Sequence, residues 1–138
     1  VLRTMHTFFD PVDPTKQRAR IDETAALALL EVWRESWEER GWKTRVLTLE
    51  DAKRHPNYDL MNQYLDSVPL EGKGGTGYYN RLWYLRWLAM QASGGGWMSD
   101  YDTIPLTSPP SPNEMILMSR RFTVFEKGVP SLLFGTAQ

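Results

Sequence analysis

The sequence contains no cysteine, no long apolar run and no excess of either charge. Without cysteine the chain forms no disulfide and no thiolate metal site, although this does not identify its compartment. No stretch reaches the roughly 18 to 20 apolar residues of a membrane span, and no secretory signal is visible. Sixteen basic and seventeen acidic residues nearly cancel, so the chain lacks the overall field that draws proteins onto nucleic acid. We therefore expect neither a membrane span nor a nucleic-acid partner.

Histidine is also scarce, which leaves few candidates for a general base. His6 and His55 are the only two, and each is better interpreted as a structural or exposed residue than as a catalyst. Glu126 is a further candidate only because it ends a predicted strand. Aromatic residues are plentiful by contrast: six Trp, six Tyr and five Phe provide either large core side chains or platforms for flat and sugar-like ligands.

The order of apolar runs and turn signals predicts a single α/β domain over residues 1–138. The expected elements are strands at 2–9, 43–49 and 121–126, and helices at 22–41, 49–55, 57–70 and 78–92. Strand followed by helix, repeated, indicates a mostly parallel sheet flanked by helices. Asp22 is placed to cap the first helix and Gly41 to end it in the left-handed conformation.

One charged residue lies on the apolar face of the helix predicted at 78–92. Successive residues are about 100° apart around a helix axis, which puts Arg86 between Leu82 and Met90, in the middle of the apolar arc. A guanidinium does not lose its proton, so a buried Arg86 requires a carboxylate or phosphate partner. The alternative is that its stem lies along the core and its head reaches solvent. Arg81, nearer the helix edge, is expected to be solvated.

The segment 94–104, GGGWMSDYDTI, places two acids one residue apart after three glycines. If the segment is extended, Met98, Asp100 and Asp102 share one face, with the two carboxylates roughly 6 to 7 Å apart. Their repulsion would be offset by a divalent cation such as Mg²⁺ or Mn²⁺. The alternative is a turn in which the aspartates bind only backbone.

The larger unit RWLAMQASGGGWMSDYDTIPL resembles the sugar-nucleotide-binding region of family 32 type glycosyltransferases, which have a GT-A fold. The resemblance is specific over residues 78–106 and extends only as an order of elements elsewhere. It implies a GT-A, Rossmann-like nucleotide-sugar-binding domain. Because such domains usually continue into an acceptor region, it also implies a fragment that is incomplete at its C-terminus.

The resemblance also assigns roles to five residues. Asp102 matches the acid that ligates the Mn²⁺ or Mg²⁺ bridging the donor diphosphate, and Asp100 matches the acid that contacts the donor ribose or sugar and, through water, the metal. Arg86 matches a helix arginine near the donor. Thr7 and Phe8 fall where relatives contact the base and ribose. The implied catalytic set is therefore Asp100, Asp102 and Arg86.

The activity implied is metal-dependent transfer of a sugar from a nucleoside diphosphate sugar to a hydroxyl of a carbohydrate or glycoconjugate acceptor. A non-catalytic nucleotide-sugar-binding or structural subunit is the alternative. A phosphoesterase or nuclease using paired acids is a third reading, but it would require more clustered acids and histidines. The resemblance is compatible with the Golgi lumen, although nothing in the sequence fixes the compartment.

Overall fold

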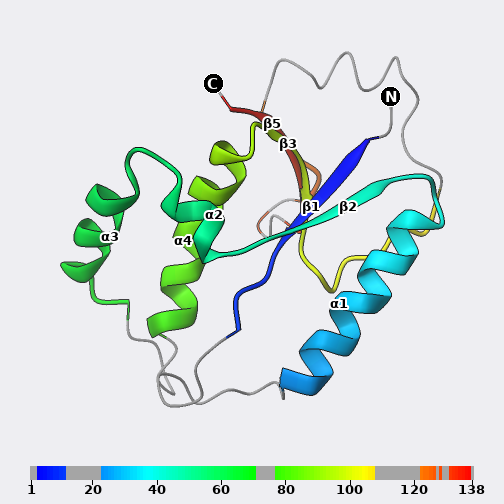
Figure 1. Cartoon of the computed structure of the whole chain (residues 1–138), viewed down its shortest axis with the longest axis horizontal. Coiled ribbons are helices and arrows are strands. Elements are labelled where there is room, and N and C mark those ends of the chain that lie inside the picture. The colour runs from blue at the N-terminus through cyan, green and yellow to red at the C-terminus, as the bar shows by residue number, and fades with distance from the viewer. Residues whose placement is uncertain are drawn as a thin grey trace.

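The computed structural model describes residues 3–11, 23–70, 77–107, 122–126, 128 and 131–137. They form an α/β domain in which strands and helices alternate as far as α2, after which two further helices and then three strands follow (Figure 1). In chain order the elements are β1 (Thr4–Phe8), α1 (Glu23–Glu38), β2 (Lys43–Leu47), α2 (Leu49–Lys53), α3 (Tyr58–Asp66), α4 (Gly77–Ala92), β3 (Gly95–Ser99), β4 (Thr123–Val124) and β5 (Leu132–Thr136). The predicted α/β class is therefore confirmed.

The sheet is mixed, whereas the sequence predicted a mostly parallel one. Its strand order is β2-β1-β3-β5-β4. β1 runs parallel to both β2 and β3, whereas β5 is antiparallel to both β3 and β4. Only residues 125–131 separate β4 from β5 in sequence, which is too short for the crossover that parallel neighbours need. The C-terminal strands therefore pair as antiparallel neighbours.

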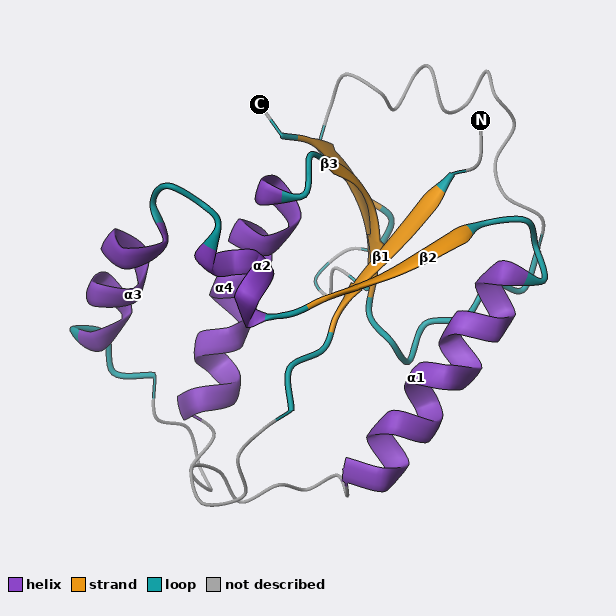
Figure 2. Cartoon of the chain, in the orientation of Figure 1, coloured by secondary structure: helices purple, strands orange, loops and turns teal. Residues whose placement is uncertain are grey.

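Helices cover both faces of the sheet and enclose a separate core on each. Figure 2 shows α1 on one side of the strands and α2, α3 and α4 on the other. The core on the α1 side contains four tryptophans and is formed by Met5, Leu30, Trp33, Trp37, Trp42 and Trp97. The core on the α4 side is mainly aliphatic and is formed by Leu47, Ala52, Leu65, Leu85, Leu88, Ala89, Met90, Met98 and Leu133. The alternation of strand side chains between the faces supplies both cores.

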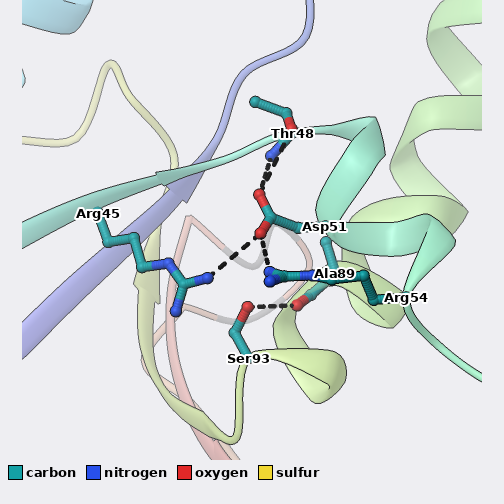
Figure 3. Close-up of polar contacts among 6 residues, drawn as sticks. All are labelled: Arg45, Thr48, Asp51, Arg54, Ala89 and Ser93. Carbon is teal, nitrogen blue, oxygen red and sulfur yellow. Dashed lines mark hydrogen bonds and ion pairs between the residues drawn. The ribbon is translucent and has the colours of Figure 1, made fainter.

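A single aspartate fixes the start of α2, as Figure 3 shows. The backbone N–H of Thr48 donates to Oδ2 of Asp51 at 2.9 Å, which satisfies one of the donors that a helix start leaves unpaired. Oδ1 of the same carboxylate pairs with Arg45 at 3.2 Å and with Arg54. Asp51 thus ties β2 to the short helix that follows it.

The three glycines at 94–96 turn the chain from α4 into β3, as their position suggested. All have positive φ, at 97°, 76° and 116°, a region that other residues rarely adopt. A Cβ on Gly95 would lie 2.6 Å from the carbonyl oxygen of Gly135, so this position also requires a bare backbone. Just before them, Ser93 Oγ donates to the carbonyl of Ala89 at 2.8 Å and satisfies one helix-end acceptor (Figure 3).

The other predicted elements are present with shorter bounds. The helix expected at 57–70 ends at Asp66, and the strand expected at 121–126 is assigned only at Thr123–Val124. Gly41 has the predicted positive φ, 77°, whereas the predicted cap Asp22 lies outside the described residues. Within the described ranges, no helix has the length and apolar character needed to cross a bilayer.

Candidate functional site at the carboxyl ends of the strands

Four acids follow strands that end at the same edge of the sheet. β1, β2 and β3 are parallel, and β4 shares their direction because it and β3 are both antiparallel to β5. Asp10 comes after β1, Asp100 and Asp102 come after β3, and Glu126 comes after β4. In open α/β sheets ligands bind at the carboxyl ends of the strands. This edge, the acidic edge, is therefore the candidate site.

The two aspartates of the D-x-D segment do not both continue the strand. β3 ends at Ser99, and the N–H of Thr103 donates to the carbonyl of Asp100 at 3.0 Å, which closes a turn. The prediction that Asp100 lies on the face of Met98 is confirmed by its contact with α4, but an extended Asp102 is wrong. The strand ends near here because β5 begins at Leu132, opposite Ser99, and one further bond follows, from the N–H of Asp100 to the carbonyl of Ser131 at 2.9 Å. Aspartate itself favours turns.

Arg86 is buried and paired with Asp100, as its position on the helix required. It is 7% exposed, and its Nη1 lies 2.9 Å from Oδ1 of Asp100. Its guanidinium also lies over the rings of Trp83 and Trp87, 4.9 Å and 4.6 Å from their centroids. The alternative of a head reaching solvent is therefore wrong. Its Nε is buried and donates no hydrogen bond within the described part of the chain.

The electrostatics of Asp100 reflect competition between burial and its neighbours. Burial raises the pKa of Asp100 above its usual value; Arg86 opposes this rise, and the negative charge of Asp102 adds to it. The Asp100 side chain is 29% exposed, and Asp102 is exposed. The turn thus presents one acid tied to the protein interior and one open to solvent.

Asp10 is a site residue that the sequence did not predict, because the segment DPVDP at 10–14 is also a typical turn signal. Its Oδ1 accepts the N–H of Leu49, at the start of α2, at 3.1 Å. Its Oδ2 accepts the hydroxyl of Tyr78, in the first turn of α4, at 3.5 Å. Burial and the charge of Asp10 raise the pKa of Tyr78. The available signal was an aspartate immediately after a buried strand.

Aromatic rings border the same edge. Tyr101, between the two aspartates, meets Phe9 edge to face with 5.6 Å between centroids. In α4, Tyr79 meets Trp83 in the same manner at 6.1 Å. Burial raises the pKa of Tyr101, and Tyr79 and Asp102 raise it further. The acidic turn therefore lies among phenol and indole rings.

Thr7 and Phe8, for which the resemblance implies contacts with the base and ribose, both lie in β1. Thr7 is fully buried, and its Oγ1 has no hydrogen-bond partner among the described residues. Phe8 packs against the core on the α4 side.

Residues 3–127 match the family described as a domain of unknown function, DUF8765. The match spans most of the 138 residues. The chain belongs to this family. No curated protein and no solved structure matches it. The match includes all four acids of the acidic edge and Arg86, so the candidate site lies within the DUF8765 domain itself.

Neither histidine of this DUF8765 domain faces the acidic edge as a free base. His6 is buried, its Nδ1 lies 2.9 Å from the carbonyl oxygen of Trp97, and burial lowers its pKa. His55 is buried between the N–H of Asn57, at 3.0 Å from Nδ1, and the amide oxygen of Gln91, at 2.6 Å from Nε2. Their interpretation as structural residues is confirmed.

Glu126 remains beside the site. It is exposed, and its Oε2 accepts a hydrogen bond from the hydroxyl of Ser131 at 2.5 Å. The carbonyl of Ser131 in turn accepts the N–H of Asp100 at 2.9 Å. Glu126 is thus connected to the acidic turn through one residue.

The acid pair of the DUF8765 domain suits a cation that takes few protein ligands. The described residues contain no group of three or more acids or histidines arranged to hold a metal ion. Mg²⁺ needs no such group, because it is usually bound by one or two carboxylates together with water and phosphate oxygens. Asp102, exposed in the turn, and Asp100, which Arg86 engages through Oδ1, supply that number of carboxylates.

Proposed function

We propose that this domain binds a nucleoside diphosphate sugar at the acidic edge and transfers the sugar to an acceptor hydroxyl. The observation that carries the proposal is the ion pair between the buried Arg86 and the partly exposed Asp100, two residues before the exposed Asp102. Structural ion pairs in a core need no second acid beside them, and a like charge there is costly. A cation and diphosphate bound at the turn would offset that cost.

In this proposal the two acids have different tasks. Asp102, open to solvent, would hold the cation that accompanies the diphosphate. Asp100 has its side chain fixed by Arg86 at 2.9 Å, so it would orient the donor ribose or sugar with little further loss of side-chain freedom. Arg86 acts through Asp100 as a positioning residue, because it is buried and already paired.

The reaction breaks the bond between the anomeric carbon and the diphosphate oxygen, which leaves with the electron pair. A new bond forms between the anomeric carbon and the acceptor oxygen, whose proton passes to a base or to water. The cation, when bound, supplies Lewis-acid stabilisation of the departing diphosphate. Glu126 is the best-placed base among the described residues, because it is exposed and is linked to the turn by Ser131.

The experiment measures donor binding and turnover in the same samples. The full chain is mixed with Mn²⁺ and one donor at a time, either a UDP-sugar or a GDP-sugar. The thermal midpoint and the release of free sugar are followed in each sample. A donor at about 100 times its Kd should stabilise the fold by roughly 2.7 kcal/mol. For a chain of this length that is a rise of about 5 to 10 °C in Tm.

Asp102→Asn should abolish the metal-dependent part of that rise and the release of sugar. Asp59→Asn, which changes an exposed aspartate of α3, is the matched control and should behave as the native chain. Binding without turnover would favour the non-catalytic nucleotide-sugar-binding module instead. If no donor changes Tm in the presence of Mn²⁺, both forms of the proposal are wrong.

A further inference from the structure

The surface of α4 carries a second feature that the donor site does not use. Asn80, Trp83, Tyr84 and Trp87 line an open hollow of about 290 Å³, called here the aromatic hollow. Trp83 and Tyr84 are 41% and 49% exposed. Large aromatic rings left in water are costly, and a cluster of them on a surface marks a binding site more often than chance.

The lining of the aromatic hollow indicates the chemistry of its ligand. Among the described residues, the four that line it are uncharged, which favours a neutral ligand over a phosphate or a peptide rich in charge. Two indoles and a phenol offer flat apolar faces whose edges carry N–H and O–H groups, while the amide of Asn80 already donates to the carbonyl of Leu70 at 2.8 Å. A pyranose ring presents the same combination of an apolar C–H face and a rim of hydroxyls. The volume lies at the lower limit of the roughly 300 to 1,000 Å³ typical of small-molecule pockets.

The aromatic hollow is linked to the acidic edge through Arg86. Its two indoles, Trp83 and Trp87, are the rings that contact the guanidinium of Arg86, which pairs with Asp100. Trp83 further contacts Tyr79 at 6.1 Å. A ligand resting on these rings would therefore lie next to the turn that carries the acids.

We infer that the aromatic hollow binds a sugar ring of a neutral oligosaccharide, which serves as the acceptor. The acceptor role rests on the proposed glycosyl transfer, whereas the binding itself does not. Rings of Trp83, Tyr84 and Trp87 stack on the apolar face of the sugar, and its hydroxyls face solvent. The shallow, open shape suits one or two rings at the end of a longer chain.

The test titrates the full chain with cellotetraose, chitotetraose, mannotetraose and lacto-N-tetraose by isothermal calorimetry, without donor. Tyr84→Ala is the deciding variant, because substitution of either indole would also disturb Arg86. Loss of one stacking ring, worth about 0.5 to 1.5 kcal/mol, should weaken binding roughly two- to ten-fold. Tyr64→Ala removes a 64% exposed tyrosine of α3 and serves as the matched control, with no expected effect.

With a donor that turns over, Tyr84→Ala should raise KM for the oligosaccharide and leave hydrolysis of the donor by water unchanged. Donor binding without binding of any oligosaccharide would overturn this inference and leave the proposed transfer intact. Oligosaccharide binding that Tyr84→Ala does not weaken would also overturn it. So would self-association, measured by sedimentation, that Tyr84→Ala abolishes, because the aromatic hollow would then be a contact between copies of the chain.

Discussion

Replacing Arg86 by methionine tests how the acidic turn is held. Methionine keeps an unbranched apolar stem and makes favourable contacts with rings such as Trp83 and Trp87, so the main loss is the charge. At 2.9 Å and an effective dielectric of about 20, the attraction of the pair is roughly 6 kcal/mol before desolvation. Breaking a buried pair usually costs about 3 to 5 kcal/mol. Because Asp100 is 29% exposed, we expect a smaller loss of about 2 to 3 kcal/mol in the free energy of unfolding at pH 7.

The loss should grow as pH rises, because Arg86 attracts Asp100 only while that carboxyl is ionised. In the native chain burial raises the pKa of Asp100 while Arg86 opposes the rise, so Arg86→Met raises that pKa further. A carboxyl with a raised folded-state pKa contributes stability below its unfolded pKa and loses it as pH rises through the folded value. The free energy of unfolding of Arg86→Met should therefore be closest to that of the native chain near pH 4, and the difference between them should increase as pH rises towards 7.

Urea unfolding followed by tryptophan fluorescence measures this at pH 4.5, 5.5, 6.5 and 7.5. The double variant Arg86→Met/Asp100→Asn should recover about 1 to 2 kcal/mol relative to the sum of the single changes, since neighbours in one ion pair are coupled. Asp102→Asn, at an exposed position, should change stability by no more than about 0.5 kcal/mol. A coupling energy of zero, or a cost of Arg86→Met that is the same at every pH, would refute the reasoning.

Three further changes test the surrounding fold, each by chemical unfolding. Asp51→Ala should cost about 1 to 2 kcal/mol by removing the capping acceptor for α2, and a loss that disappears at high salt would show that ion pairs matter more than the cap. Gly95→Ala should cost at least about 3 kcal/mol because its Cβ would meet backbone at 2.6 Å, whereas Gly41→Ala, with similar φ and open space, should cost only about 1 kcal/mol; equal costs would contradict the steric argument. Trp33→Phe should cost about 2 to 3 kcal/mol, since it leaves a cavity and removes the 2.8 Å hydrogen bond from the indole to Ser99; a loss under 1 kcal/mol would be inconsistent with that bond.

Local signals were sufficient for the helices and for the parallel half of the sheet. The apolar stripe Ala26, Leu29, Leu30, Trp33 and Trp37 predicts the core face of α1; four of these residues are buried, whereas Leu29 is 37% exposed. Gly41 ended the helix as expected because only the local backbone decides that conformation. The antiparallel strands were not predicted, because the pairing of β5 with β3 depends on partners far apart in sequence and no local pattern encodes it.

In the site, too, features set by local sequence could be predicted, whereas features that depend on distant segments could not. Arg86 was recognised because burial of a permanent charge is visible from helical periodicity alone. The turn at Asp100 and Asp102 was left open, since an extended and a turned segment have the same sequence and only the end of the neighbouring strand decides between them. Asp10 was missed because its partners, Leu49 and Tyr78, come from two other elements.

The charges of the acidic edge restrict what the proposed site can bind. Arg86 is permanently charged and pairs with Asp100, so together they carry no net charge while Asp100 is ionised. Asp10, Asp102 and Glu126 then leave the edge negative, and a bare diphosphate would be repelled. An anionic donor therefore requires a divalent cation to bind here, and the affinity for a nucleoside diphosphate should fall sharply when the cation is chelated. Binding that is equally tight in EDTA would place the nucleotide elsewhere on the molecule.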